Sequence, residues 1–531
     1  MNIQRKIYIA FLALTVTAMG CRKGFEEMNK PWKESGTTDI GPSFNAVVRS
    51  MLLGWQEQAT FTSFIYASTQ QGIILGETGY HPEEAGKELW FNYFSTIADV
   101  RLLEKMIDAK PDQSKMKHIR AMLKVLVAYK TLRMVDYFGS IPYFEGGRSA
   151  EGPGKYRVKY DDPKVIYDTC LADLKWAITN LAPDPSQETL AAYETFLNGD
   201  VAKWAKFANS LRLRYAVRMY EVNKAEADKI IADALQLPLI ADGEDIGMWP
   251  LKISGLLLDG RTWSFGDSRL RLGTTMWKLM SDNNNEDGTG IFDPRCVVFF
   301  EPNTAGKWKA YPQNPDATAP GDGGTPYNGL RETGDWLKDK GVTNFSSFNF
   351  YITRDNNTIP ELMITADEVH FTKAEIYLRG MGVGKNVALA GQEYEKGIRA
   401  AVSLAYQQAL NSTIWKVNKP AGQPSVAQMN KLLTNTKVAF KAGDEAAALK
   451  QIYAQQWIGN FRQPEEAWAL QKRTNYATPM ETVNAQLYAT TRYGKMRRLT
   501  YPTDEQNYNH ANWEAATGGT DSETKNPWWM K

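Results

Sequence analysis

The stretch that decides the fold is GDVAKWAKFANSLRLRYAVRM, residues 199–219. Its apolar residues Trp204, Phe207 and Leu211 are spaced i, i+3 and i+7, which places them on one face of a helix. We expect that face to be buried and Trp204 to be a core residue. Arg212 and Arg214 lie further along, where each can pair with a carboxylate across a helix hairpin. The stretch therefore predicts one member of a packed pair of helices.

The same helical spacing of apolar residues recurs along most of the chain and predicts an all-α fold. Several of the predicted helices follow one another after short polar turns, a pattern that is typical of helix-hairpin packing. The sequence shows no clean repeat of 34 residues, so any solenoid character is degenerate. The predicted helices are Lys115–Tyr137, Pro163–Leu181, Lys203–Tyr220, Ala225–Ala234, Ala366–Arg379, Glu393–Leu410, Glu445–Phe461 and Pro464–Lys472.

The helical pattern fades between about residues 237 and 360, where Gly, Pro, Asn and Asp are frequent. Long irregular segments inside a compact protein commonly carry function. This region also contains large aromatic residues, namely Trp263, Trp308, Tyr311, Tyr327 and Trp336. We therefore expect a helical scaffold with one large, irregular, loop-rich side that holds a ligand.

The N-terminus is typical of a lipoprotein precursor. Arg5 and Lys6 precede the apolar run 7–19, which is too short to span a bilayer and fits a secretory signal peptide, residues 1–20. Cys21 follows small residues. We expect the signal peptide to be cleaved directly before Cys21 and this residue to be acylated, which gives a stable membrane anchor. The alternative is an ordinary signal cleaved at Gly20. We expect a tether over residues 21–40 and a single domain over residues 41–531.

The charge balance argues against nucleic acid as a partner. The chain has 62 Lys and Arg and 60 Asp and Glu. Removal of the signal peptide, which contains Arg5 and Lys6, leaves equal numbers of basic and acidic residues. Binding to phosphate backbones requires a basic surplus or a basic stripe, and no such cluster occurs in the sequence. After Cys21, the remaining cysteines are Cys170 and Cys296, which could pair but which we expect to be buried free thiols.

Six blocks of sequence, which follow one another along the chain in the family's order, resemble the SusD/RagB family of outer-membrane lipoproteins from Bacteroidetes. The resemblance covers nearly the whole mature chain, and the segment 199–219 is its most specific block. The other blocks are CRKGFEEMN (21–29), AYKTLRMVDYFGSIPYFEGG (128–147), ITADEVHFTKAEIYLRG (364–380), IYAQQWIGNFRQPEEAWALQKRTNY (452–476) and MRRLTYPTDEQNYNHANW (496–513).

The resemblance implies a SusD-like fold, in which tetratricopeptide-like helix pairs form the scaffold and an irregular half carries the ligand site. It also implies a location and partners. The protein would be lipid-anchored in the outer membrane, facing the exterior, and would act as the lid of a SusC-like TonB-dependent barrel. The expected ligand is an oligosaccharide or polysaccharide, with a peptide as the alternative that some branches of the family take.

We expect the ligand to stack on aromatic side chains. A sugar ring has an apolar face and a polar rim, which a flat ring with polar neighbours fits well. The loop GETGYHPEEAGKELWFN (76–92) contributes two such rings and the irregular region the others; for any single ring the alternative is packing within a loop. The candidate ligand-binding residues are Tyr80, Trp90, Trp263, Trp308, Tyr311 and Trp336.

The run SDNNNEDGTGIFDPR (281–295) partly matches a calcium-binding loop. Asn283, Asn285 and Asp287 give alternating oxygen ligands, and Gly288 stands at the sixth position. However, the twelfth position is Pro294, so the bidentate glutamate is missing, and a solvated turn is the favoured interpretation. We therefore expect no cofactor, with calcium as the alternative.

The motifs of common catalytic sites are absent or incomplete. The segment GMGVGKN (380–386) lacks the first glycine and the Ser or Thr of a phosphate-binding loop. The four histidines show no metal-ligand spacing. A glycosidase would need only two carboxyl groups at the right separation, which a sequence does not reveal. We therefore predict a binding protein without catalytic residues and keep a surface glycosidase as the alternative.

Overall fold

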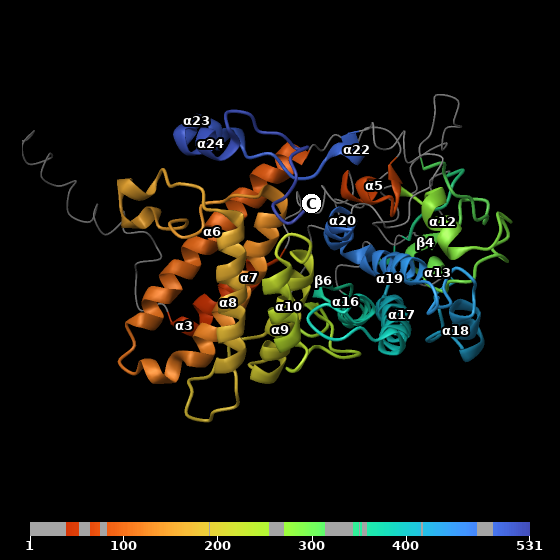
Figure 1. Cartoon of the computed structure of the whole chain (residues 1–531), viewed down its shortest axis with the longest axis horizontal. Coiled ribbons are helices and arrows are strands. Elements are labelled where there is room, and N and C mark those ends of the chain that lie inside the picture. Colours follow the sequence, from red (N-terminus) through yellow and green to blue (C-terminus); the bar gives the residue numbers. More distant parts are fainter. Residues whose placement is uncertain are drawn as a thin grey trace, which may run out of the picture.

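The computed structural model describes residues 39–52, 64–74, 82–190, 192–253, 270–313, 343–349, 351–352, 358–415, 418–474 and 492–531. Within these residues the protein is mainly α-helical, which confirms the predicted fold class (Figure 1). The helices are α3 (Ile40–Arg49), α5 (Tyr66–Thr69), α6 (Pro82–Asp108), α7 (Lys117–Phe138), α8 (Pro163–Asn180), α9 (Val201–Arg218), α10 (Lys224–Ala234), α12 (Thr274–Met280), α13 (Cys296–Phe299), α16 (Ala366–Arg379), α17 (Val387–Asn411), α18 (Val426–Leu433), α19 (Glu445–Gly459), α20 (Pro464–Arg473), α22 (Arg492–Lys495), α23 (Thr503–Tyr508) and α24 (His510–Thr517).

The long helices pack in the order in which they occur along the chain. Helices α6 to α10 lie next to one another in one half of the molecule, and α16, α17 and α19 form a second group (Figure 1). Helix α9 joins the groups, because it packs against α7, α8 and α10 on one side and against α16 and α20 on the other. This is the predicted scaffold of helix pairs.

Helix α9 begins and packs as its sequence predicts. The carboxylate of Asp200 accepts hydrogen bonds from the backbone N–H groups of Ala202 and Lys203, which fixes the first turn. Trp204 is fully buried, and its ring makes edge contacts with Phe44 and Phe196. The prediction of Trp204 as a core residue is confirmed.

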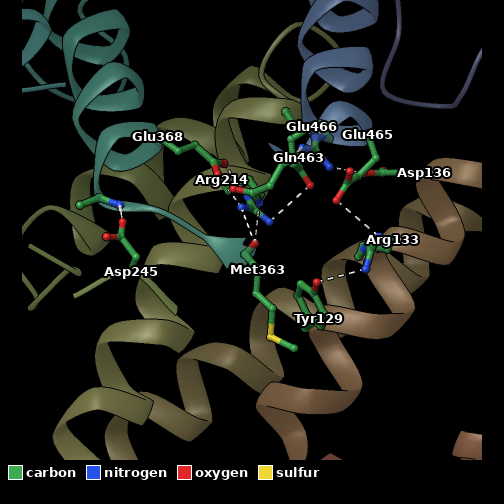
Figure 2. A network of polar contacts seen from close by, with 12 residues as sticks. Tyr129, Arg133, Asp136, Arg214, Asp245, Met363, Glu368, Gln463, Glu465 and Glu466 are labelled. Carbon is green, nitrogen blue, oxygen red and sulfur yellow. Dashed lines mark hydrogen bonds and ion pairs between the residues drawn. The ribbon is translucent and has the colours of Figure 1, made fainter. Parts of the chain in front are cut away.

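The arginines of α9 pair with carboxylates, as expected. Arg212 contacts Asp233 on α10 at 2.5 Å, across the helix hairpin. Arg214 donates two hydrogen bonds of 2.5 Å to Glu368 on α16 and lies 3.3 Å from Glu466 on α20. Figure 2 shows the side chains of Arg214, Glu368 and Glu466 converging between the helices. Because all three charged groups are buried, removing one partner would leave an uncompensated charge in the core.

The segment 76–92 differs from its sequence-based prediction. We expected an exposed loop, yet helix α6 already begins at Pro82. Proline is favourable in the first turn of a helix, where its missing N–H has no partner to lose. The Gly- and Pro-containing sequence therefore marks the start of α6. The short helices α18, α23 and α24 were also not predicted.

Within the described residues, the predicted irregular region forms only short elements. Strands β1 (Ile73–Ile74), β3 (Leu270–Arg271), β5 (Ser347–Phe348) and β4 (Phe300–Glu301) form one antiparallel sheet in that order. Strands β2 (Ile246–Met248) and β6 (Glu361–Ile364) form a second antiparallel pair. Helix α13 packs against α17 and strand β4, and α12 and α18 lie on the same side of the molecule, where the candidate site is found (Figure 1).

The cysteines and the hydropathy of the helices bear on two further predictions. Cys170 and Cys296 are both buried and free, as predicted, and burial raises the pKa of Cys170 to about 12, so this thiol stays neutral. None of the described helices combines the length and the apolar run that crossing a bilayer requires.

Candidate functional site

Two hollows meet at Trp308, one of the predicted ligand-binding residues. The larger, which we name the Trp415 hollow, has a volume of about 660 Å³. The smaller, which we name the Trp277 hollow, has a volume of about 450 Å³. Both volumes lie within the range that proteins use to hold small ligands. Trp308 lines both hollows and is partly exposed, so its ring forms their shared wall.

The Trp415 hollow is built from segments that are far apart in the sequence. Its aromatic wall comprises Trp308, Tyr351, Tyr406 from α17, and Trp415, which follows that helix. The rings of Tyr351 and Trp415 are stacked, with centroids 5.5 Å apart and planes at 5°. Burial raises the pKa of Tyr406 to about 12, so its hydroxyl stays protonated and donates to the carbonyl of Pro294. Tyr351, Tyr406 and Trp415 are 4–6% exposed and form a fixed backing, so the partly exposed Trp308 is the ring that is most accessible to a ligand.

The remaining lining of the Trp415 hollow is rich in neutral polar groups. The side chains that contribute them are Asn349, Asn418, Gln423, Ser425 and Gln428. Some are already engaged: the Asn349 side-chain oxygen accepts from the N–H of Tyr351, and Ser425 and Gln428 form the capping box of α18. Among the described lining residues, Glu301 is the one that carries a charge. Flat rings beside amides and hydroxyls suit a ligand with apolar faces and a hydroxylated rim.

The Trp277 hollow combines two indole rings with a charged rim. The rings of Trp277 and Trp308 are nearly parallel, with centroids 6.4 Å apart and planes at 15°. Lys309 is exposed, and its ammonium group lies 3.9 Å from the carboxylate of Glu286. The residues that line this hollow are Thr274, Trp277, Lys278, Asn284, Glu286, Trp308, Lys309, Ala310 and Pro312.

The run that partly matches a calcium loop supports both tryptophans. The side-chain oxygen of Asn284 accepts a hydrogen bond of 3.1 Å from the indole N–H of Trp277. Gly288 has a φ of 79°, and a Cβ atom there would lie 2.7 Å from the Trp308 ring. Gly288 is thus required both by the backbone conformation and by the close approach of the ring.

The predicted calcium ligands make turn hydrogen bonds. Asn283 accepts from the backbone N–H of Asn285, and Asp287 accepts from the N–H and hydroxyl of Thr289. In the described parts of the chain, no group of three or more His, Cys, Asp or Glu side chains is placed to hold a metal ion. The contacts agree with the turn that the sequence favoured, and calcium binding stays an untested alternative.

Trp90 and Tyr311, two other predicted ligand-binding residues, are buried. Trp90 lies on α6 and is 3% exposed, its ring packs against Phe138 and Tyr501, and its indole N–H donates to Glu505. Tyr311 is 6% exposed and makes an edge contact with Phe345. Both rings are packed against other aromatic residues and line neither hollow, so they stay outside the candidate site. The expectation of a loop at Trp90 failed because α6 begins before it.

The other predicted functional residues lie outside the described residues. These are Tyr80, Trp263 and Trp336 for ligand binding and Cys21 for lipid attachment. Their roles stay predictions.

Sequence reasoning did not select Trp277, Tyr351, Tyr406 or Trp415. Trp277 lies in the apolar stretch TTMWKLM, which reads as core, and Tyr406 lies on the periodic face of a helix. Trp415 comes directly after a helix, in NSTIWKVNKP, where a large aromatic residue is a usable signal. The others line the site only because distant segments meet there.

Comparisons with known proteins agree with this architecture. A family model described as SusD-like, Susd and RagB outer membrane lipoprotein, matches residues 66–530. No curated protein matches the chain. Among solved structures, "Bacteroidetes AC2a SusD-like" is similar with a TM-score of 0.70 at 20% identity, over 93% of this chain and 100% of that one. A chitin-binding protein is similar with a TM-score of 0.68 at 24% identity, over 92% and 98%. A SusD homolog from Parabacteroides distasonis has a TM-score of 0.68 at 21% identity, over 93% and 98%.

The solved structures share the fold of this chain, and the family model covers most of its length. The chain belongs to the SusD/RagB family of outer-membrane lipoproteins.

Proposed function

We propose that the protein is a lipid-anchored, non-catalytic glycan-binding protein of the cell surface. It captures an oligosaccharide and acts as the lid of a SusC-like TonB-dependent barrel in the outer membrane. The observation that carries the binding function is the Trp415 hollow, where Trp308 and the stacked pair Tyr351–Trp415 stand among amide and hydroxyl groups. Membership of a family of outer-membrane lipoproteins supports the anchor and the location.

The partly exposed ring of Trp308 is the proposed stacking surface. The backbone N–H of Trp308 donates a hydrogen bond of 2.7 Å to the carbonyl of Glu286, and the edge of its ring lies against Gly288. A rigid ring loses little conformational freedom when a ligand binds, so contact with a sugar face is gained at small entropic cost. Tyr80, Trp263 and Trp336 stay candidates for further contacts with the same ligand.

Isothermal titration against a panel of glycans tests the binding function. Chito-oligosaccharides are the first probe, because a structurally similar protein is described as chitin-binding. Malto-, cello- and xylo-oligosaccharides and a set of peptides complete the panel. Binding to a glycan supports the proposal, and the affinity should be nearly independent of ionic strength, since no dense charge is neutralised. Binding to peptides alone would replace the glycan by a peptide ligand, and binding to nothing would reject the function.

Glycoside cleavage is the alternative that needs a separate test. The reaction requires two carboxyl groups that flank one glycosidic bond. Of the described lining residues, Glu301 is the carboxylate in the Trp415 hollow and Glu286 the carboxylate in the Trp277 hollow. Long incubation of the protein with the glycan that it binds, followed by chromatography of the products, separates the two functions. Unchanged chain length agrees with a binding protein, and shortened products would show an enzyme.

A further inference from the structure

We propose that the ligand is an extended glycan that lies across Trp308 and fills both hollows, so that the Trp277 hollow is a second subsite. The inference rests on the proposed function, because it assigns a length and a path to the ligand of the same site. It goes beyond that function by giving α12 and the loop 281–290 a direct role in binding.

The sizes of the hollows are the first argument. Each of them alone, at about 660 Å³ and about 450 Å³, is large enough for a small ligand. Because both include Trp308 in their lining, a ligand that stacks on this ring is adjacent to both. A ligand that ended at Trp308 would leave the second hollow to solvent. An extended chain of sugars would instead remove apolar surface from water on both sides.

The construction of the Trp277 hollow is the second argument. Its two indole rings are nearly parallel and held in place, Trp277 by Asn284 and Trp308 by Gly288. Its rim provides charged hydrogen-bonding groups in Lys309 and Glu286. Hydrogen bonds from charged donors to sugar hydroxyls are stronger than those between neutral groups. Trp277 is 3% exposed and backs the hollow, and the partly exposed ring of Trp308 stands beside polar groups here as it does in the Trp415 hollow.

Lys309 and Lys307 provide a matched pair of variants. Both lysines are exposed, and both lie near the same carboxylate, Glu286, at 3.9 Å and 3.7 Å. Only Lys309 belongs to the residues that line the Trp277 hollow. Replacing either lysine by alanine should leave the fold intact, since substitutions of exposed residues rarely change stability by more than about 0.5 kcal/mol. A difference in binding between the two variants therefore reports on the hollow and not on the loss of a positive charge nearby.

The test is a titration of the parent, Lys309→Ala and Lys307→Ala with one glycan series of increasing length, from the monosaccharide upward. The series is the one that the parent binds most tightly among chito-, malto-, cello- and xylo-oligosaccharides. We expect the parent affinity to keep rising with length, and Lys309→Ala to weaken binding of the long members about tenfold, the size of one hydrogen bond from a charged donor. Short members should bind Lys309→Ala and the parent equally, and Lys307→Ala should match the parent throughout.

Two outcomes would overturn the inference, and they differ from a failure of the proposed function. If Lys309→Ala binds all lengths like the parent, or weakens all lengths by the same factor, then the Trp277 hollow is not a separate subsite. In both cases the parent still binds glycan and the proposed function stands. If the parent binds no glycan of any length, the proposed function and the inference fail together.

Discussion

Trp204 and Trp176 lie on neighbouring helices, and their exposure differs sharply. Trp204 on α9 is fully buried between aromatic rings, whereas Trp176 on α8 is 38% exposed, with the ammonium group of Lys124 over its ring. The sequence predicted the burial of Trp204, because its neighbours recur at helical spacing. The same periodicity could not show which aromatic residues remain partly exposed, since exposure depends on segments that pack from elsewhere.

The first prediction compares these two residues. Trp204→Ala should lower the free energy of unfolding by roughly 3–5 kcal/mol, because it leaves a cavity in the core. Trp176→Ala should cost clearly less, because its ring is already 38% exposed and its cation–π contact contributes only about 1 kcal/mol. Urea denaturation followed by circular dichroism measures both. Equal losses for the two variants would mean that the packing around Trp204 is misassigned.

Glu375 is a buried residue whose charge depends on its partners. Burial opposes its ionisation, but Arg473 and Arg379 outweigh burial and lower the pKa of the carboxyl from 4.5 to about 2. The contacts are hydrogen bonds of 2.6 Å from Arg473 and 2.8 Å from Arg379. A pKa that is lower in the folded state means that the ionised group stabilises the fold above pH 4.5. This contribution is lost as the pH falls from there towards 2.

The second prediction follows from the lowered pKa of Glu375. At neutral pH, Glu375→Gln should lower the free energy of unfolding by roughly 3–5 kcal/mol, since two buried arginine contacts lose their charge partner. The difference between parent and variant should narrow as the pH falls from 5 to 3, because the parent then begins to lose the same contribution. Urea titrations at several pH values measure this difference in the free energy of unfolding. A difference that stays constant over this range would contradict the assignment.

At the level of elements, the predicted helices agree with the structure to within two residues at each end, except α17, which begins six residues earlier than predicted. Helix α16 spans Ala366–Arg379 as predicted, and α8 differs by one residue at its end. Helix α6 was missed, because Pro82 and nearby glycines suggested a loop. The strands were missed as well, since strands of two to four residues are too short to show an alternating pattern.

The third prediction concerns the close contact between α16 and α17. Gly397 on α17 lies against the buried ring of Phe371 on α16, and a Cβ atom at Gly397 would be 2.7 Å from that ring. Helix propensity alone would favour Gly397→Ala by about 1 kcal/mol. Overpacking against a fixed ring costs typically 1–3 kcal/mol. We therefore expect a net loss of stability of about 1 kcal/mol in thermal or urea denaturation.

A second variant separates the two contributions. In a Phe371→Leu background the ring is absent, so Gly397→Ala should be neutral or stabilising there. If Gly397→Ala destabilises both backgrounds equally, the ring is not the cause.

At the level of the whole molecule, the fold could be predicted from the sequence, whereas most of the candidate site could not. The family resemblance and the helix pattern follow from contiguous blocks. The Trp415 hollow instead brings together Trp308, Tyr351, Tyr406 and Trp415, which belong to separate segments of the chain. Trp308 is the predicted ligand-binding residue that the structure places at both hollows, whereas Trp90 is part of the core. Tertiary packing decides between these two outcomes.

The fourth prediction addresses the membrane anchor. Cys21→Ala should prevent acylation, so the protein should be released into the soluble fraction or retained as an uncleaved precursor. Fractionation of membranes after a salt wash, with the parent as control, measures this. If the variant stays firmly in the outer membrane, either Cys21 carries no lipid or the barrel alone holds the protein. Co-purification of a TonB-dependent barrel from detergent extracts would distinguish these two explanations and would support the proposed function as the lid of that barrel.

The measurement that tests the central claim most directly is a titration of the Trp308→Ala variant with the glycan that the parent binds. Trp176→Ala serves as the control, because this exposed tryptophan lines neither hollow. We predict that Trp308→Ala weakens binding at least about tenfold, equivalent to 1.4 kcal/mol, and keeps the helical circular-dichroism spectrum. Trp176→Ala should bind like the parent. Parent-like affinity in Trp308→Ala would contradict the account and place the ligand elsewhere on this fold.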